Sequence, residues 1–176
     1  MVATKHTDIS THLVFRAPLA EDGERVWQLV GDCPPLELNS PYCYLLLCTH
    51  FAGTCAVAER GADLVGFLAG YRKPTAPDVL FVWQIATHPA ARGQGIARQL
   101  LADVCGRGAT RFIEATVTPD NTTSRAFFGA VARRAGVPCR ESLLFAADLF
   151  GGTHHAPEYL LRIGPLNPHH PTKEES

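Results

Sequence analysis

The sequence predicts an α+β fold, and two observations carry this prediction. Three consecutive strands joined by short turns precede a strand–helix unit, and this order is typical of the α+β class. The third strand then leads through a glycine loop into a helix, in the stretch LFVWQIATHPAARGQGIARQLL of residues 80–101. The fold therefore brings a helix N-terminus to the end of a strand.

Size and composition are those of a soluble globular protein. The chain of 176 residues can bury a core within one domain, and it is 46% hydrophobic and 19% charged. A net charge of −1 offers no basic surface for nucleic acid. No apolar run is long enough to cross a bilayer, and the polar start MVATKHTDISTH lacks the apolar core of a signal peptide. We therefore expect a cytoplasmic protein.

Six cysteines occur, and none forms a C-x-x-C pair or lies near histidines at zinc-finger spacing. They are Cys33, Cys43, Cys48, Cys55, Cys105 and Cys139. Several lie within apolar stretches, where a reduced thiol behaves as a small hydrophobe. We expect free, buried thiols in a reducing compartment and no metal site.

The first part of the chain predicts a strand and two helices. Residues 12–16 alternate as a strand does, and residues 21–30 have helical spacing with Trp27 as a core anchor. Pro34 and Pro35 cannot extend that helix.

The next segment, residues 36–51, predicts a second helix with Asn39 or Ser40 as its cap and Pro41 at its first position. It is apolar nearly all round, so we expect it to be mostly buried. Two interpretations stay open: a capped core helix, or one wall of a substrate site.

The middle of the chain predicts a hairpin. Residues 55–59 and 64–71 pair across the polar turn 60–63, and a second turn at 74–78 feeds the strand that begins near Leu80.

The second half alternates helices and strands. The expected elements are a helix at 96–104, a strand at 112–117, a helix at 122–132, and strands at 141–146 and 158–163. In the later helix Ala126, Phe127 and Val131 are expected to face inward, with Gly136-Val137-Pro138 ending it. A polar loop spans 148–157. Residues 1–11 and the tail 164–176 are expected to be disordered, which leaves a single domain over 12–163.

The loop Arg92-Gly93-Gln94-Gly95 is the first candidate binding element. A helix N-terminus carries unsatisfied N–H groups and a partial positive charge, and glycines let a phosphate reach the backbone. The loop is neither a G-x-x-x-x-G-K-[ST] nucleotide loop nor a G-x-G-x-x-G dinucleotide motif. An ordinary strand-to-helix turn with one exposed arginine is the alternative interpretation.

Two motifs give a resemblance. Arg92-x-x-Gly95-x-Ala97 after a strand resembles the pyrophosphate loop of the GNAT acetyltransferase superfamily, and the segment from Asn121 to Phe128 resembles its N-x-x-[SA]-x-x-F-Y helix. The resemblance implies a mixed, mostly antiparallel sheet with helices on both faces, splayed between the strand ending at Ala86 and the strand starting at Arg111. Acetyl-CoA would lie in that gap, with no metal.

The cofactor residues that this resemblance implies lie on the strand end, the loop and the later helix. They are Ile85, Ala86, Thr87, Arg92, Gly93, Gln94, Gly95, Ile96, Ala97, Asn121, Ser124, Phe127 and Phe128.

Longer strings are similar to one family within this superfamily, the L-2,4-diaminobutyrate acetyltransferases of ectoine biosynthesis. The strings cover residues 32–48, 80–84, 114–119 and 159–165. This resemblance implies transfer of the acetyl group of acetyl-CoA to the γ-amine of L-2,4-diaminobutyrate, giving N4-acetyl-L-2,4-diaminobutyrate and CoA, by a homodimer.

The chemistry requires a neutral amine, although a side-chain amine has a pKa of roughly 10. The resemblance implies a backbone N–H between Trp83 and Ala86 as the oxyanion donor. We expect Glu114 to accept the proton, directly or through water; the alternative is a plain carboxylate on a solvated face. Phe128 replaces the tyrosine that often protonates the thiolate, so CoA leaves as the thiolate, takes a proton from water, or receives one from Tyr42 or Tyr44.

Acetylation of the γ-amine requires a pocket that holds the amino-acid end, because the α-amine is the less basic of the two. The candidate catalytic residues are Glu114, Trp83 and Tyr44, and the candidate substrate residues are Asp32, Glu37, Asn39, Tyr42, Tyr44, Trp83, Glu114, His155 and Glu158. Trp83 as a core aromatic, and His154-His155 as mere loop polarity, are the alternatives.

Two rival functions remain. One is a GNAT enzyme that acts on another amine, such as ornithine, a polyamine or a protein N-terminus. The other is a non-catalytic acyl-CoA-binding module, which the phenylalanine at position 128 makes conceivable.

Overall fold

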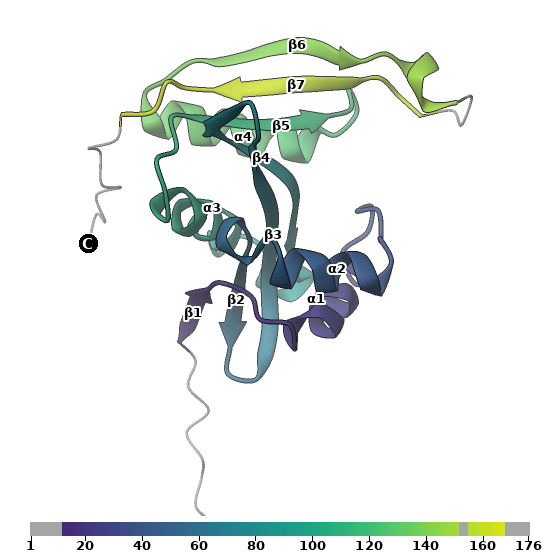
Figure 1. The fold of residues 1–176 in the computed structure, drawn as a ribbon, viewed down its shortest axis with the longest axis vertical. Helices are drawn as coiled ribbons and strands as arrows, with labels where there is room; N and C mark the ends of the chain where they lie inside the picture. The colour runs from purple at the N-terminus through teal and green to yellow at the C-terminus, as the bar shows by residue number, and fades with distance from the viewer. Residues whose placement is uncertain (1–11, 152–154, 168–176) are drawn as a thin grey trace, which may run out of the picture. The chain divides into compact units, whose positions relative to one another are not determined.

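The structure is a computed structural model that describes residues 12–151 and 155–167. The chain forms two compact units, each built from two stretches (Figure 1). Unit 1 comprises residues 1–68 and 86–103, and unit 2 comprises residues 69–85 and 104–176. His154 and the two terminal segments 1–11 and 168–176 lie outside the described residues, so the expectations for them stay predictions.

Unit 1 contains two short strands, two α-helices, two short 3-10 helices and parts of three longer elements. They are β1 (Leu13–Arg16), α1 (Asp22–Gly31), α2 (Pro41–Thr49), η1 (Ala52–Thr54), β2 (Ala56–Arg60), the start of β3 (Asp63–Lys73), the end of β4 (Ala76–Thr87), η2 (Pro89–Ala91) and most of α3 (Ile96–Gly106). The hairpin expected at residues 60–63 is confirmed: β2 and β3 are antiparallel, with Gly61 at φ 61° in the turn.

Helices α3 and α2 cover opposite faces of β3 in unit 1. A Cβ on Gly66 would lie 2.6 Å from Cγ2 of Ile96, so the missing side chain lets α3 approach the strand. The next residue, Phe67, points to the other face because side chains alternate along a strand. Its ring meets that of Tyr44 from α2 edge-on, with the centroids 6.2 Å apart.

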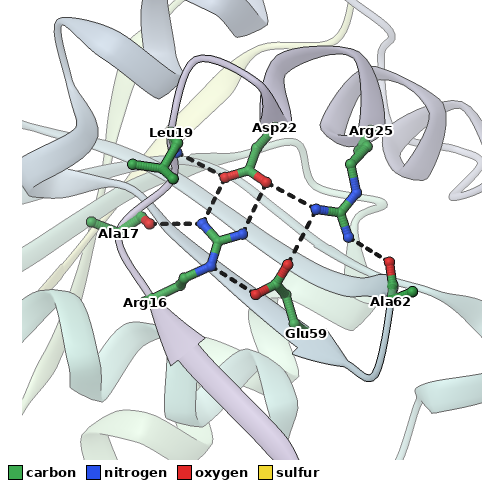
Figure 2. Close-up of polar contacts among 7 residues, drawn as sticks. All are labelled: Arg16, Ala17, Leu19, Asp22, Arg25, Glu59 and Ala62. Carbon is green, nitrogen blue, oxygen red and sulfur yellow. Dashed lines mark hydrogen bonds and ion pairs between the residues drawn. The ribbon is translucent and has the colours of Figure 1, made fainter. Parts of the chain in front are cut away.

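A network of four charged side chains ties β1, α1 and β2 together in unit 1 (Figure 2). Arg16 donates to Asp22 at 2.6 and 2.9 Å and to Glu59 at 2.7 Å. Arg25 donates to the same two carboxylates, each at 3.1 Å. Asp22 is buried and also accepts from the backbone N–H of Leu19 at 2.8 Å. The network therefore holds the start of α1 against the sheet.

Unit 2 contains the remaining strands and one further helix. They are the ends of β3 and α3, most of β4, β5 (Phe112–Val117), α4 (Thr122–Ala135), β6 (Cys139–Phe145), η3 (Ala147–Phe150) and β7 (Glu158–Ile163). The bounds of β5 and β7 are those expected from sequence. Gly136 ends α4 in the left-handed conformation at φ 65°, as expected from the Gly136-Val137-Pro138 stretch.

The strands follow the order β1-β2-β3-β4-β5-β7-β6. β4 and β5 are parallel, whereas the pairs β1–β2, β2–β3, β5–β7 and β6–β7 are antiparallel. The α+β class and the mixed, mostly antiparallel sheet are therefore confirmed for the part of the chain that the structure describes.

The parallel pair β4–β5 separates part-way along its length. The paired register runs from Val79↔Phe112 to Phe81↔Glu114. Both strands continue beyond it, β4 to Thr87 and β5 to Val117. Within unit 2 the two strands therefore diverge after Phe81, which is the splay that the family resemblance implies.

Two expectations about helix faces are wrong. α2 is buried on one face only: Tyr44 and Leu47 are buried, whereas Tyr42 is 68% exposed and Leu45 is 42% exposed. Apolar composition all round does not define a face, so only packing selects the buried side. In α4 the buried residues are Phe128 and Ala132, whereas of the expected set Phe127 and Val131 are half-buried and Ala126 is exposed, because packing decides which side of the helix is covered.

Two boundaries also differ from the expectation. β4 begins at Ala76 after a tight turn at Pro74-Thr75, because Pro77 near a strand start removes only one N–H from the ladder. Gly164 is buried and donates its N–H to the carbonyl of Pro138 at 3.2 Å, and the N–H of Leu166 donates to that of Arg111 at 2.7 Å. The chain past Ile163 is thus attached to unit 2 as far as Leu166.

All six cysteines are free, as expected, but they are not all buried: Cys139 is exposed, and Cys43 and Cys105 are half-buried. No helix among the described residues is long and apolar enough to cross a membrane. In those same residues no group of three or more histidine, cysteine, aspartate or glutamate side chains could hold a metal ion.

Candidate active site

The glycine loop lies at the start of α3 in unit 1. Gly93 and Gly95 adopt φ values of 79° and 75°, a backbone conformation that residues other than glycine rarely adopt. α3 begins at Ile96, directly after Gly95. The first N–H groups of a helix have no acceptor within it, and they carry its positive dipole end. The geometry therefore fits an anion-binding turn, as the sequence predicts.

Side chains around this loop hold it in place. The side-chain amide of Gln94 accepts a hydrogen bond from the guanidinium of Arg60 and donates to the carbonyl of Ala90 at 3.4 Å. Nε of Arg92 donates to the carbonyl of Thr87 at 3.4 Å, which joins the loop to the end of β4. The same carbonyl accepts from Sγ of Cys33 at 3.4 Å.

Unit 1 holds five predicted substrate residues: Asp32, Glu37 and Asn39 lie in the segment between α1 and α2, and Tyr42 and Tyr44 lie on α2. Asp32 is exposed and, with Trp27 and Leu38, lines an open pocket of about 400 Å³. Ser40, rather than Asn39, caps α2 by accepting from the N–H of Cys43 at 3.3 Å. The remaining two candidates, Glu37 and Tyr42, are exposed.

Tyr44 lies in the core of unit 1 with no exposed surface. Its hydroxyl accepts a hydrogen bond from the backbone N–H of Asn39 at 3.3 Å. The residue therefore holds the segment in front of α2 in place, which is a positioning contact. Its expected catalytic role stays a prediction.

Trp83 projects from β4 in unit 2, beyond the last pair with β5, and is 50% exposed. The alternative of a core aromatic is therefore wrong. Ile85 and Ala86 follow it on the same strand, half-buried and buried respectively. The resemblance implies an oxyanion donor on the backbone of this stretch, and that role stays a prediction.

Glu114 is buried in unit 2 at 1% exposure, so the alternative of a carboxylate on a solvated face is wrong. One oxygen accepts from Nζ of Lys73 at 2.9 Å, and the other accepts from the guanidinium of Arg162. Arg162 also lies over the ring of Phe112, 3.9 Å from its centroid. Two cations thus occupy both carboxylate oxygens.

His155 and Glu158 lie at the start of β7, beside the carboxyl end of β5. Nδ1 of His155 is 2.6 Å from the carbonyl of Ala156, which can only accept, so Nδ1 carries the proton. Nε2 lies 3.9 Å from a carboxylate oxygen of Glu158, and the ring stacks on Phe150 at 4.0 Å. The imidazole of His155 and the carboxylate of Glu158 therefore lie side by side just before and at the start of β7.

The predicted cofactor helix α4 begins in unit 2. Asn121 caps it by accepting from the N–H of Ser124 at 3.0 Å. The rings of Phe127 and Phe128 meet edge-on with centroids 5.1 Å apart, and Phe128 is buried. A phenyl ring donates no proton, so α4 offers no acid at this position.

The structure brings together some of the predicted residues and divides others between the two units. Unit 1 holds the loop residues 92–97, Ala86 and Thr87, and the candidates from Asp32 to Tyr44. Unit 2 holds the other predicted residues: Trp83, Ile85, Glu114, Asn121, Ser124, Phe127, Phe128, His155 and Glu158.

Three residues at the site have no counterpart in the sequence prediction. Lys73 and Arg162 neutralise Glu114, and each stands near the end of an expected strand, where a charge signals little by itself. Cys33 bonds to the end of β4 across 54 positions of sequence, and no local pattern indicates that contact.

Comparison with known proteins first defines the class. The model of the acetyltransferase (GNAT) family matches residues 23–131, and the chain belongs to that family. Ard1 from Thermoplasma volcanium, at 16% identity, shares the fold with a TM-score of 0.70 over 88% of this chain and 99% of that chain. The α+β acyltransferase fold expected from the motifs is confirmed.

Closer relatives define the particular family. The chain is 46% identical to an L-2,4-diaminobutyric acid acetyltransferase of Bordetella parapertussis, covering 94% of this chain and 90% of the relative, and 45% identical to that of Chromohalobacter salexigens, covering 89% and 83%. Diaminobutyrate acetyltransferase EctA from Paenibacillus lautus, solved with L-2,4-diaminobutyric acid and coenzyme A, is 43% identical with a TM-score of 0.83 over 89% of this chain and 96% of that chain. The chain belongs to the L-2,4-diaminobutyric acid acetyltransferases.

Proposed function

We propose that this protein transfers the acetyl group of acetyl-CoA to the γ-amine of L-2,4-diaminobutyrate, releasing N4-acetyl-L-2,4-diaminobutyrate and CoA for ectoine biosynthesis. The observation that carries the proposal is the likeness, over nearly the whole chain, to an enzyme solved with this substrate and coenzyme A. The transfer needs no metal, because the amine attacks the thioester directly.

The cofactor contacts are proposed from the loop and the two strand ends. The diphosphate would bind the N–H groups of residues 93–97, where the helix dipole and the two glycines favour an anion. The pantetheine arm would lie along the edge of β4 that β5 leaves after Phe81, with Ile85, Ala86 and Thr87. On α4, Asn121, Ser124, Phe127 and Phe128 complete the proposed set.

A thioester placed along that edge would direct its carbonyl at a backbone N–H between Trp83 and Ala86. Such a fixed donor stabilises the oxyanion without reorganising, and its loss in other enzymes costs about 3 kcal/mol. The leaving thiol has a pKa of roughly 8.5, so departure as the thiolate is tolerable without an acid.

Glu114 is the proposed proton acceptor. Each of its oxygens already accepts a hydrogen bond from a cation, so only the remaining lone pairs could take the amine proton. The imidazole of His155 and the carboxylate of Glu158, whose nearest nitrogen and oxygen atoms lie 3.9 Å apart, are proposed to hold the amine groups of the substrate. Asp32, Glu37, Asn39, Tyr42 and Trp83 complete the proposed substrate set.

The test of this function is turnover with defined amines. Thiol release from acetyl-CoA is followed with L-2,4-diaminobutyrate, L-ornithine and 1,4-diaminobutane, and NMR of the product assigns the acetylated nitrogen. We expect diaminobutyrate to give the highest kcat/KM and acetylation at N4. Faster turnover of a longer diamine would favour the broader GNAT function, and coenzyme A binding without any thiol release would favour the non-catalytic module.

We also propose that the protein acts as a homodimer in the cytoplasm. All seven residues of β6 are exposed, including Leu143 and Phe145, and β6 lies at the outer edge of unit 2 (Figure 1). An exposed apolar edge strand is a ready surface for a second copy. Sedimentation should give a dimer that Leu143→Lys weakens and Leu149→Lys, outside the strand, does not; a monomeric parent chain would contradict this.

A further inference from the structure

A single backbone carbonyl in unit 1 joins the segment 32–39, which is proposed to bind the substrate, to the Arg92 loop, which is proposed to bind the cofactor. The carbonyl of Thr87, the last residue of β4, accepts hydrogen bonds from Sγ of Cys33 and from Nε of Arg92, each at 3.4 Å. A carbonyl oxygen has two lone pairs, so it can accept both hydrogen bonds and thereby join Cys33 to Arg92.

The thiol of Cys33 is a hydrogen-bond donor at neutral pH. Burial raises the pKa of the Cys33 thiol above its ordinary value, and this effect outweighs the lowering by the positive charge of Arg92. Cys33 is 1% exposed, so its S–H is shielded from water and directed at Thr87.

Cys33 is also an anchor for the segment in front of α2. Its N–H donates to the carbonyl of Val30 at 3.0 Å, and its carbonyl accepts from the N–H of Leu36 at 3.1 Å. Asp32, its neighbour in the chain, is exposed. The side chain of Cys33 thus links, by a hydrogen bond, the segment that carries Asp32 to the end of β4.

We propose that Cys33 is a positioning residue that couples cofactor binding to substrate binding: through the carbonyl of Thr87 it holds the segment 32–39 against the end of β4 and the Arg92 loop. A diphosphate on that loop would order Arg92 and Thr87, and so lower the cost of ordering segment 32–39 around the substrate. The inference rests on the proposed function only for the identity of the substrate.

The kinetic test compares three variants with the parent protein. Cys33→Ala removes the S–H, Cys33→Ser keeps a donor, and Cys48→Ala removes the same atoms from an equally buried cysteine of α2. We expect Cys33→Ala to raise the KM for L-2,4-diaminobutyrate about fivefold, equivalent to about 1 kcal/mol, and the KM for acetyl-CoA at saturating diaminobutyrate by a similar factor, because coupling between two binding sites is reciprocal. Cys33→Ser and Cys48→Ala should stay within twofold for both.

Equal KM changes in Cys33→Ala and Cys48→Ala would overturn the proposal, because they would reduce Cys33 to a packing residue. A rise in the KM for only one of the two substrates in Cys33→Ala would also overturn it, because a lost coupling affects both.

A second measurement separates this inference from the function itself. Hydrogen exchange of the amides of residues 36–39 is followed with and without coenzyme A alone. We expect coenzyme A to slow their exchange in the parent protein and in Cys33→Ser, but not in Cys33→Ala. If the parent protein fails to acetylate diaminobutyrate while this pattern holds, the proposed substrate is wrong and the coupling stands; if coenzyme A protects the segment equally in all three, the coupling is wrong.

Discussion

Replacing Asp22 by asparagine tests the charged network of unit 1 most directly. The carboxylate is buried and accepts from Arg16 at 2.6 and 2.9 Å, from Arg25 at 3.1 Å and from the N–H of Leu19 at 2.8 Å. Asparagine keeps the shape but removes the charge and turns an acceptor into a donor that faces two guanidinium groups. The loss is therefore electrostatic rather than a matter of volume.

The magnitude follows from burial. Removing one partner of a buried ion pair costs about 3–5 kcal/mol. The side chains of Arg16 and Arg25 are 28% and 36% exposed, so solvent screens part of the interaction, and we expect a loss of about 2–3 kcal/mol. For a chain of this size that corresponds to a fall in Tm of about 4–12 °C.

The assay is thermal unfolding followed by circular dichroism at pH 7, with Glu24→Gln as the control. Glu24 lies on the same helix and is exposed, where it accepts a hydrogen bond from Gln28 at 3.3 Å. We expect its Tm to stay within about 1 °C of the parent, since exposed pairs contribute little. A Tm for Asp22→Asn equal to that of Glu24→Gln would refute the reasoning.

The same network predicts the direction of the pH dependence. Burial raises the pKa of Asp22, but hydrogen bonds from Arg16 and Leu19 and the charges of Arg16 and Arg25 together hold it below its ordinary value. The hydrogen bond from Arg16 likewise lowers the pKa of Glu59. The unfolded chain therefore binds more protons in acid, so this stability is present above the ordinary carboxyl pKa of about 4 and is lost as the pH falls below it. The Tm of Asp22→Asn should fall less steeply between about pH 5 and 3 than that of the parent; parallel curves would contradict this.

Three further outcomes follow from local geometry. Gly66→Ala places a Cβ 2.6 Å from a side chain of α3 and should cost about 1–3 kcal/mol by denaturant unfolding, whereas Gly53→Ala, with no atom within 4 Å, should be neutral. Gly95→Ala, at φ 75°, should weaken coenzyme A binding at least fivefold by calorimetry, while Gly151→Ala, at φ 63°, should leave it unchanged. Glu114→Gln should lower the Tm by several degrees, because two cations lose their partner, and should lower kcat about a hundredfold, because the proposed proton acceptor is removed.

Each of these outcomes has a clear counter-result. A neutral Gly66→Ala would mean that α3 does not approach β3 as described. Equal loss of affinity in Gly95→Ala and Gly151→Ala would mean that backbone strain alone, rather than the anion-binding loop, is responsible. A fall in kcat of less than tenfold for Glu114→Gln, with the acid limb of the pH profile retained, would exclude Glu114 as the proton acceptor.

Local sequence patterns were sufficient to predict most of the helices and strands. Glycines at the loop before α3 and proline at the start of α2 act through their own backbone restrictions, so a short window of sequence defines them. The bounds of β5 and β7 follow in the same way from runs of β-formers between turn residues. The family motifs lie in these locally determined stretches, which is why the fold class and the glycine turn before α3 could be predicted.

The sequence by itself thus determined the class, the order of elements and the glycine turn that is proposed to bind the cofactor. Only the tertiary structure decided that α2 buries one face, that two cations form ion pairs with Glu114, and that Cys33 hydrogen-bonds to the end of β4. The physical reason is that secondary structure and turns depend on neighbouring residues, whereas burial and ion pairing depend on side chains brought together from distant strands. Contacts such as those of Lys73 and Arg162 with Glu114 span 41 and 48 positions, and no pattern within a single strand contains them.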